Sequence, residues 1–248
     1  MEWALKWGME FNVGKCKCMK LGKLSKAVEY NRYIMGGKEL EITKEERDLG
    51  VITTDNFKSS QQCNTAAKKA NRVLGMIRRV INTRSAKVLL PLYKALVRPH
   101  LEYAVQAWSP HLVKDIEILE RVQHRFTRMV EGLKELEYKQ RLEYLGLPSL
   151  RFRRLRGDLI ETFKILKGNE RVKSEKFFTL SHNTKTRGHS LKLCTGKSRI
   201  DNRKYSFSSR VVRDWNELPE EVICSNTINK FKKRIDVYFS KVGALYEC

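Results

Sequence analysis

From Ser59 onward, apolar residues recur at every third or fourth position, and this period constrains the fold more than any other feature. The apolar positions are Cys63, Ala66, Ala67, Ala70, Val73, Leu74, Ile77, Val80 and Ile81. An interval of three to four residues places side chains on one face of an α-helix. The sequence therefore predicts a long amphipathic helix over residues 59–81.

The same period predicts further helices, and a different pattern predicts short strands ahead of them. Helices are expected over residues 85–97, resuming to 108 after a kink or stop near Pro99, and over 114–130, 151–168 and 228–239. Three short runs within residues 15–52, separated by glycine and charged turns, predict small strands. Residues 169–203 are polar and basic, which predicts irregular or extended structure. The expected fold is mainly α with a small β remnant near the N-terminus, an α+β class.

At the amino end, Trp3, Trp7 and Phe11 recur at helical spacing. No capping residue precedes them, so the chain is expected to begin in the middle of an amphipathic helix. A fragment of a longer protein would begin in this way.

The net charge indicates the class of partner. Lys and Arg number 50 against 28 Asp and Glu, which leaves +22. This excess is +2 over residues 1–58, +8 over 59–146 and +12 over 147–248. Polyanions are attracted to such a chain by Coulomb force and counterion release, so nucleic acid is the expected partner and the later two thirds should hold the binding surface.

Membrane insertion and secretion are not expected. No window approaches the ~18 consecutive apolar residues of a membrane span, and the start lacks the features of a signal peptide. The six cysteines show no framework spacing, so they are expected to be free thiols. An intracellular protein is predicted.

Several enzyme classes lack their motifs. A polymerase needs two carboxylates that hold a pair of metal ions, yet the adjacent pairs Glu45–Glu46 and Glu220–Glu221 stand in charged, turn-like stretches typical of a solvated surface. There is no P-loop, no nucleophile elbow and no HExxH helix. The series His182, His189, Cys194 could contribute zinc ligands, but it lacks a C-x-x-C partner, so no metal site is predicted.

Basic rows stand on two of the expected helices. Arg121, Arg125 and Arg128 share a face opposite the apolar stripe and are candidate phosphate contacts. Four more arginines crowd the first turns of the helix over 151–168: Arg151, Arg153, Arg154 and Arg156. Their mutual repulsion at a helix N-terminus suggests an anionic partner. A single charge row is nevertheless often only a solvated face.

The order of several segments resembles a known family. These are WALKWGMEFNVGKCKCMKLG, YIMGGKEL, ERDLGVIT, KKANRVLGMIRR, LYKALVRPHLEYAVQAWSP, LERVQHRFTRMVEGL, RLRGDLIETFKILKG, RGHSLKL and FSSRVVRDWNELP. Together they span nearly the whole chain, and they resemble LINE-type non-LTR retrotransposon reverse transcriptases of the jockey-like and chicken-repeat-like groups.

This resemblance implies three regions. Residues 1–58 would be the end of the polymerase palm with a primer-grip-like hairpin, 59–132 a helical thumb-like bundle, and 133–248 a basic carboxyl-terminal extension. Lys15, with Lys17 second, would match the lysine that polymerases place near the leaving pyrophosphate.

The resemblance also implies binding residues. Leu49, Gly50 and Val51 would form the centre of the primer-gripping hairpin, a role that needs a firmly packed backbone. Five cations would track the template and primer backbone: Lys68, Lys69, Arg72, Arg78 and Arg79.

The resemblance begins after the catalytic aspartates of the family. The chain is therefore expected to bind RNA and DNA, including an RNA–DNA hybrid, and to be inactive as an RNA-directed DNA polymerase alone. No cofactor is expected here, although the intact polymerase would need Mg²⁺ and the amino-terminal part would be a partner. A ribonucleoprotein of nucleus and cytoplasm is implied. Two alternatives stay open: a host-retained RNA-, DNA- or protein-binding adaptor, and a translated relic without selected function.

Overall fold

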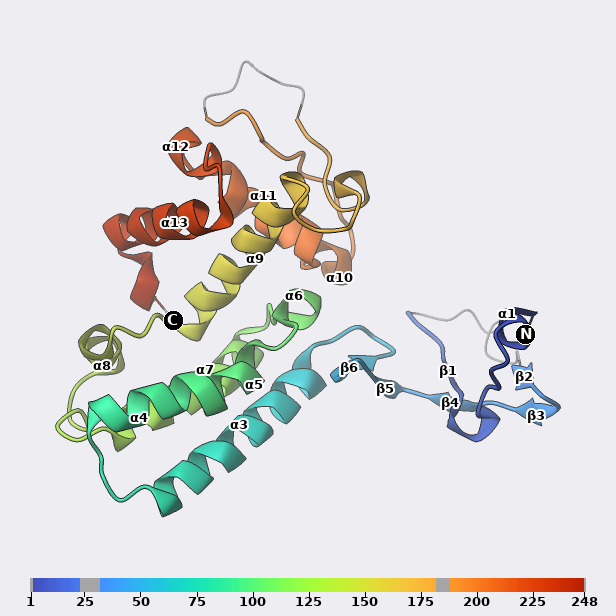
Figure 1. Ribbon diagram of the computed structural model, residues 1–248, viewed down its shortest axis with the longest axis horizontal. Helices are drawn as coiled ribbons and strands as arrows, with labels where there is room; N and C mark the ends of the chain where they lie inside the picture. The colour runs from blue at the N-terminus through green and yellow to red at the C-terminus, as the bar shows by residue number, and fades with distance from the viewer. Residues whose placement is uncertain (1, 23–31, 182–187, 248) are drawn as a thin grey trace. The chain divides into compact units, whose positions relative to one another are not determined.

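The computed structural model describes residues 2–22, 32–181 and 188–247 of the chain. It is mostly helical, with 57% helix and 9% strand, and its few strands lie near the N-terminus (Figure 1). The expected fold class, mainly α with a small β remnant, is confirmed. None of the helices in these ranges is both long enough and apolar enough to cross a lipid bilayer.

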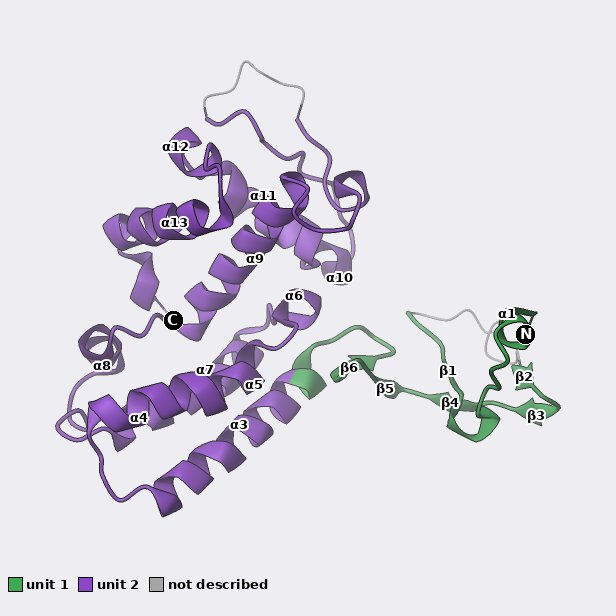
Figure 2. Cartoon of the chain, in the orientation of Figure 1, with its two compact units in different colours: residues 1–62 green, residues 63–248 purple. Residues whose placement is uncertain are grey.

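The chain divides into two compact units (Figure 2). Unit 1 comprises residues 1–62 and unit 2 residues 63–248. The sequence places a boundary after residue 58, four residues ahead of the observed one, and a second boundary after residue 132. The helices on both sides of residue 132 belong to unit 2, because α7 packs on both α8 and α9.

Unit 1 contains paired short strands in place of the three that the sequence predicts. Parallel β1 (Lys17–Met19) and β4 (Glu41–Thr43) form one pair. Antiparallel β2 (Ile34–Met35) and β3 (Lys38–Glu39) form a second, and antiparallel β5 (Glu45–Asp48) and β6 (Val51–Thr54) a third. Two-residue turns divide the predicted runs. Gly36 and Gly37 both have positive φ, which such hairpin turns require.

The amino-terminal helix is shorter than its apolar spacing predicts. Helix α1 (Glu2–Lys6) ends in a turn at Gly8, where φ is +62°. The side chains of Trp3 and Trp7 remain 60% and 62% exposed. Within unit 1 these aromatic rings form no buried stripe. Phe11 lies beyond the helix, ahead of the short 3₁₀ helix η1 (Val13–Lys15).

The helices between residues 60 and 129 follow the predicted pattern, and all but the first residues of α3 belong to unit 2. They are α3 (Ser60–Val80), α4 (Ala86–Leu92), the π-helical turn η2 (Tyr93–Val97), α5 (Arg98–Glu102), α6 (Val105–Trp108) and α7 (Val113–Met129). Pro91 lies inside α4 and the π-helical turn follows it, as expected where a proline lacks its N–H. The break falls after Pro99, at Ala104, where φ is +50°. Tyr93 stacks on Phe126 with 4.1 Å between ring centroids and ties the segment to α7.

The later elements of unit 2 form its main core. They are α8 (Tyr138–Leu145), α9 (Leu150–Leu166), the 3₁₀ helix η3 (Ser174–Lys176), α10 (Asp201–Lys204), α11 (Phe207–Asn216), α12 (Glu220–Ile223), α13 (Ile228–Val242) and η4 (Ala244–Tyr246). The predicted helices over 151–168 and 228–239 are thus present. The Ser149 hydroxyl caps α9 by accepting a hydrogen bond from the Phe152 N–H at 3.1 Å.

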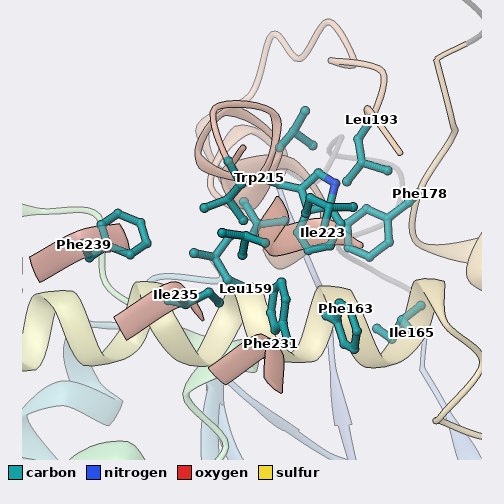
Figure 3. Close-up of a cluster of buried hydrophobic side chains, with 14 of the residues drawn as sticks. Leu159, Phe163, Ile165, Phe178, Leu193, Trp215, Ile223, Phe231, Ile235 and Phe239 are labelled. Carbon is teal, nitrogen blue, oxygen red and sulfur yellow. The ribbon is translucent and has the colours of Figure 1, made fainter. Parts of the chain in front are cut away.

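The core is built from aromatic and aliphatic side chains of α9, α11, α12 and α13 (Figure 3). Phe163 stacks on Phe231 with 4.1 Å between centroids, and Trp215, fully buried, lies 6.0 Å from Phe231. The region predicted to be irregular, residues 169–203, contributes Phe178 and Leu193 to the same cluster. Its described part is mostly irregular, as expected, but it closes one side of the core.

Candidate nucleic-acid interface

Helix α3 carries the five cations that the sequence resemblance predicts to follow a nucleic-acid backbone. Its opposite side is anchored by buried side chains that include Ala70, Leu74 and Ile77, so the helix cannot rotate to hide its cations. Lys68, Arg72 and Arg79 follow each other at intervals of four and seven residues along an exposed stripe. Lys69 and Arg78 flank the stripe, the former half-buried and the latter exposed.

The five predicted α3 cations lack acidic partners. Across the described ranges, no carboxylate forms an ion pair with any of them. Their positive charge is therefore not neutralised locally, and it is available to an external anion. Arg78 and Arg79 also stabilise the helix itself, because cations in the last turn interact favourably with the helix dipole.

Arg84, which the sequence did not single out, fixes the end of α3. Its guanidinium donates to the carbonyl of Ile81 at 2.8 Å and to that of Arg78 at 3.2 Å. These bonds satisfy carbonyls that a helix end leaves open. Arg84 therefore positions the last basic turn.

The row on α7 divides into three different environments. Arg121 pairs with Glu117 at 3.3 Å, one turn away. Arg125 donates a 2.6 Å hydrogen bond to the side chain of Asn71 and so links α7 to the basic face of α3. Arg128 is exposed, and no described carboxylate pairs with it. The structure thus places Arg125 beside the α3 row.

The arginines at the start of α9 require a correction. The sequence assigned them to an anionic partner, but three of the four have internal environments. Arg153 forms a two-pronged pair with Glu102, one arm being 2.8 Å. Arg156 holds Asp236 in the same way, at 2.6 and 2.9 Å. These carboxylates relieve the repulsion that the sequence pattern implied.

Arg154 lies inside the protein, with 4% of its surface exposed. Burial lowers the pKa of its guanidinium, while Glu120 and Asp158 act in the opposite direction. Its two terminal nitrogens have no hydrogen-bond partner among the described residues. Arg154 is therefore removed from the candidate surface, and of this group only Arg151 remains exposed.

Arg153 provides a test of structural against binding roles. Replacing Arg153 with alanine should lower the free energy of unfolding by about 1 to 3 kcal/mol, because half-buried Glu102 would lose both hydrogen bonds from Arg153 and be left with Arg98, whose Nε lies 3.8 Å away. Affinity for an RNA–DNA hybrid should stay within about twofold of the parent.

Arg121→Ala is the matched control, since its pair with Glu117 is exposed and should contribute less than about 0.5 kcal/mol. Urea denaturation and hybrid titration of both variants make the comparison. A large affinity loss in Arg153→Ala with unchanged stability would contradict the internal role.

The two lysines that the resemblance singles out in unit 1, Lys15 and Lys17, have different surroundings. Lys15 is exposed at the end of η1. Lys17 pairs with Glu46 at 3.3 Å and with Glu41 at 3.7 Å. The hydrogen bond from Lys17 to Glu46, followed by the charges of both carboxylates, raises the pKa of Lys17. Lys17 is thus occupied within unit 1, and Lys15 is the more accessible lysine.

Leu49 and Gly50 form the turn between β5 and β6, with φ of +44° and +88°. The Leu49 side chain is 86% exposed, so the firmly packed centre that the sequence predicted is not found at this residue. A leucine in the left-handed region is strained, whereas Gly50 adopts it freely. Val51 is half-buried, and the N–H of Ile52 donates to Gln62 at 2.9 Å, which anchors the hairpin.

The described members of the possible zinc series, His189 and Cys194, have separate partners. His182 lies outside the described residues. His189 is buried, its Nε2 is 2.9 Å from the carbonyl oxygen of Trp215, and the thiol of Cys194 donates to the carbonyl of Leu180 at 3.5 Å. Within the ranges that the structure describes, no three His, Cys, Asp or Glu side chains could hold a metal ion together. None of the five cysteines described is in a disulfide.

Instead, His189 should make stability depend on pH. Burial lowers its pKa, so below the unfolded value of about 6.5 the unfolded chain binds a proton that the folded chain resists. The free energy of unfolding should therefore fall as pH drops through 6.5. The same direction holds for His124, whose pKa is lowered first by burial and then by Arg141 and Arg128.

His189→Gln should show a smaller loss of stability than the parent when both are denatured with urea at neutral pH and at a pH about one unit below 6.5. Comparing two proteins cancels the contributions of Asp158 and Asp214, whose pKa values are raised mainly by burial. Equal pH dependence in the two proteins would contradict this account.

Comparison with known proteins adds no identification. No protein-family model, curated protein or solved structure matches the chain.

Proposed function

We propose that the chain binds nucleic acid through the basic face of α3, as the carboxyl-terminal, nucleic-acid-gripping part of a LINE-type reverse transcriptase. The observation that carries the proposal is the α3 row, whose five cations have no carboxylate partner within the described ranges while the opposite face of the helix is buried. A row fixed in this way can contact phosphates without first breaking internal pairs.

The length of the row suits a nucleic-acid backbone. From Lys68 to Arg79 the helix rises about 17 Å at about 1.5 Å per residue. That distance matches about five nucleotides along one strand, at about 3.4 Å each. The Arg125–Asn71 bond adds a cation from α7 to the same face. Contacts of this kind read phosphate positions rather than base sequence.

The polymerase part of the proposal rests on the sequence resemblance. It gives α3 the place of a thumb helix that holds template and primer, and it gives the β5–β6 turn the place of a primer-gripping hairpin. The partners would be an RNA–DNA hybrid and the amino-terminal part of the polymerase, in an intracellular ribonucleoprotein. The intact enzyme would need Mg²⁺ held by carboxylates of that other part.

The proposal is tested by a primer-extension assay paired with a binding titration on the same samples. We expect the purified chain to bind a labelled RNA–DNA hybrid and to extend no primer, with or without Mg²⁺. Addition of the amino-terminal part of such a polymerase should restore extension. Extension by the chain alone, or no binding of the hybrid at low salt, would contradict the proposal.

A second candidate is a self-contained binding or adaptor protein with the same basic surface. It is favoured by the core of unit 2, which buries Trp215, Phe231 and Phe163 with no side chain from the described residues of unit 1. The candidate predicts cooperative unfolding of a monomeric chain and no gain of polymerase activity when the amino-terminal part is added.

A further inference from the structure

A hollow of about 740 Å³ opens where the end of α7, the start of α8, the start of α9 and η4 meet. Its volume falls within the roughly 300 to 1,000 Å³ typical of small-molecule sites. The carboxyl-terminal segment closes one side, because the N–H and the hydroxyl of Ser149 donate to the carbonyls of Leu245 and Glu247 at 2.9 and 2.6 Å. Helix η4 packs against both α8 and α9, and Figure 1 shows α8 near the start of α9. We call this feature the cationic hollow.

Three exposed cations from three helices line the cationic hollow: Arg128 of α7, Lys139 of α8 and Arg151 of α9. In the part of the chain that is described, neither Arg128 nor Lys139 pairs with a carboxylate. Cations drawn from separate helices converge here without forming a helical row, so sequence spacing gave no signal for the site. Their convergence favours a ligand with concentrated negative charge.

A buried fourth cation fixes the floor. Arg141 is 1% exposed, and its guanidinium donates to the hydroxyl of Thr127 at 2.9 Å and to the carbonyl of Leu136. It also lies 3.1 Å from Nε2 of His124. A guanidinium can only donate, so Nε2 of His124 is the acceptor in this contact. Burial, then the charges of Arg141 and Arg128, lower the pKa of His124. The floor is therefore positive and held in place before any ligand arrives.

Two of the described residues that line the hollow are acidic. Glu137 lines the hollow, but its side chain accepts the N–H of Gln140 in the capping box of α8 and is directed to the helix end. Glu247 is the other acidic lining residue. The described lining thus holds two carboxylates and four guanidinium or ammonium groups.

An aromatic wall completes the cationic hollow. The Tyr138 ring lies 4.7 Å from the His124 ring and 5.5 Å from the guanidinium carbon of Arg141, and Tyr246 also lines the space. The Tyr138 hydroxyl donates to Glu120 at 2.6 Å, which fixes the ring. An anchored ring beside convergent cations suits a ligand that joins a phosphate to a planar base.

We propose that the cationic hollow binds a nucleotide, with its phosphate among Arg128, Lys139 and Arg151 and its base against the tyrosine wall. The nucleotide is either free or part of a single strand. The site is lined by residues outside α3, so it stands apart from the proposed α3 interface.

Isothermal titration of the full chain with AMP, adenosine and inorganic phosphate tests the proposal. AMP should bind at least about tenfold more tightly than adenosine, which lacks the phosphate, and more tightly than phosphate, which lacks the ring. The variant Arg128→Gln with Lys139→Gln should lose at least about tenfold in AMP affinity. Failure of AMP to bind, or equal affinity in parent and variant, would overturn the proposal.

Two controls separate this site from other effects. Lys134→Gln with Lys173→Gln removes the same charge from exposed positions outside the hollow and should keep parental AMP affinity. Alanine at Lys68, Lys69, Arg78 and Arg79 should also keep it, so failure of the α3 interface leaves this result intact. A loss of AMP binding equal to that of the double variant in either control would overturn the site. Displacement of AMP by an unphosphorylated oligonucleotide would identify a strand as the source of the nucleotide, and displacement by mononucleotides alone a free nucleotide.

Discussion

Simultaneous replacement of Lys68, Lys69, Arg78 and Arg79 with alanine is expected to weaken binding of an RNA–DNA hybrid by at least about tenfold at low salt. Each cation that neutralises a phosphate releases a counterion, so the plot of log affinity against log salt should become less steep by about 3 to 4. Fluorescence anisotropy with a labelled hybrid at several salt concentrations measures both quantities. The variant should fold normally, since three of these side chains are exposed and Lys69 is half-buried.

A matched variant removes the same four charges elsewhere in unit 2. This variant replaces two lysines and two arginines, as the α3 variant does, and all four are exposed: Arg171, Lys173, Lys176 and Arg199. Their replacement with alanine should reduce affinity less than the α3 variant and should leave most of the salt slope. Equal losses in the two variants would mean that net charge, rather than the α3 row, determines binding.

A second large effect, on the free energy of unfolding, is expected from a substitution in the core of unit 2. Trp215→Ala should lower the free energy of unfolding by about 3 to 5 kcal/mol, because the side chain is fully buried and its removal leaves a cavity. It also deletes the hydrogen bond from the indole N–H to the Leu191 carbonyl, which is 2.8 Å long. Circular dichroism during urea denaturation measures the change without depending on tryptophan emission.

Trp3→Ala is the control for that measurement, since Trp3 is 60% exposed in unit 1 and should change stability by less than about 0.5 kcal/mol. The comparison also addresses the relic hypothesis. A decayed chain without a cooperative core would show a broad transition that neither substitution alters. A sharp transition that moves only for Trp215→Ala would instead indicate a specific core.

The helices could be predicted because the spacing of apolar residues that indicates a helix lies within the helix's own sequence. The three- and four-residue spacing placed α3, α7, α9 and α13 within a few residues of their observed ends. The number of strands could not be predicted, because the two-residue turn at Gly36–Gly37 divides one apparent strand into β2 and β3. Phe178 and Leu193 show a further limit, since their burial depends on residues far along the chain.

The candidate site was predictable only in part, for the same reason. The α3 row lies on one helix, and three of the cations that the resemblance singles out, Lys68, Arg72 and Arg79, share one exposed face of it. The partners of Arg153 and Arg156 are Glu102 and Asp236, 51 and 80 residues away, and no local pattern connects them.

The most direct test of nucleic-acid binding is a competition titration of the unmodified chain. A labelled RNA–DNA hybrid is bound at low salt and displaced by unlabelled hybrid, or by polyglutamate of equal total charge, between about 50 and 200 mM salt. The account predicts salt-dependent binding in which unlabelled hybrid displaces the label at much lower concentration than polyglutamate. Equal displacement by the two polyanions, or no binding at low salt despite a net charge of +22, would contradict it.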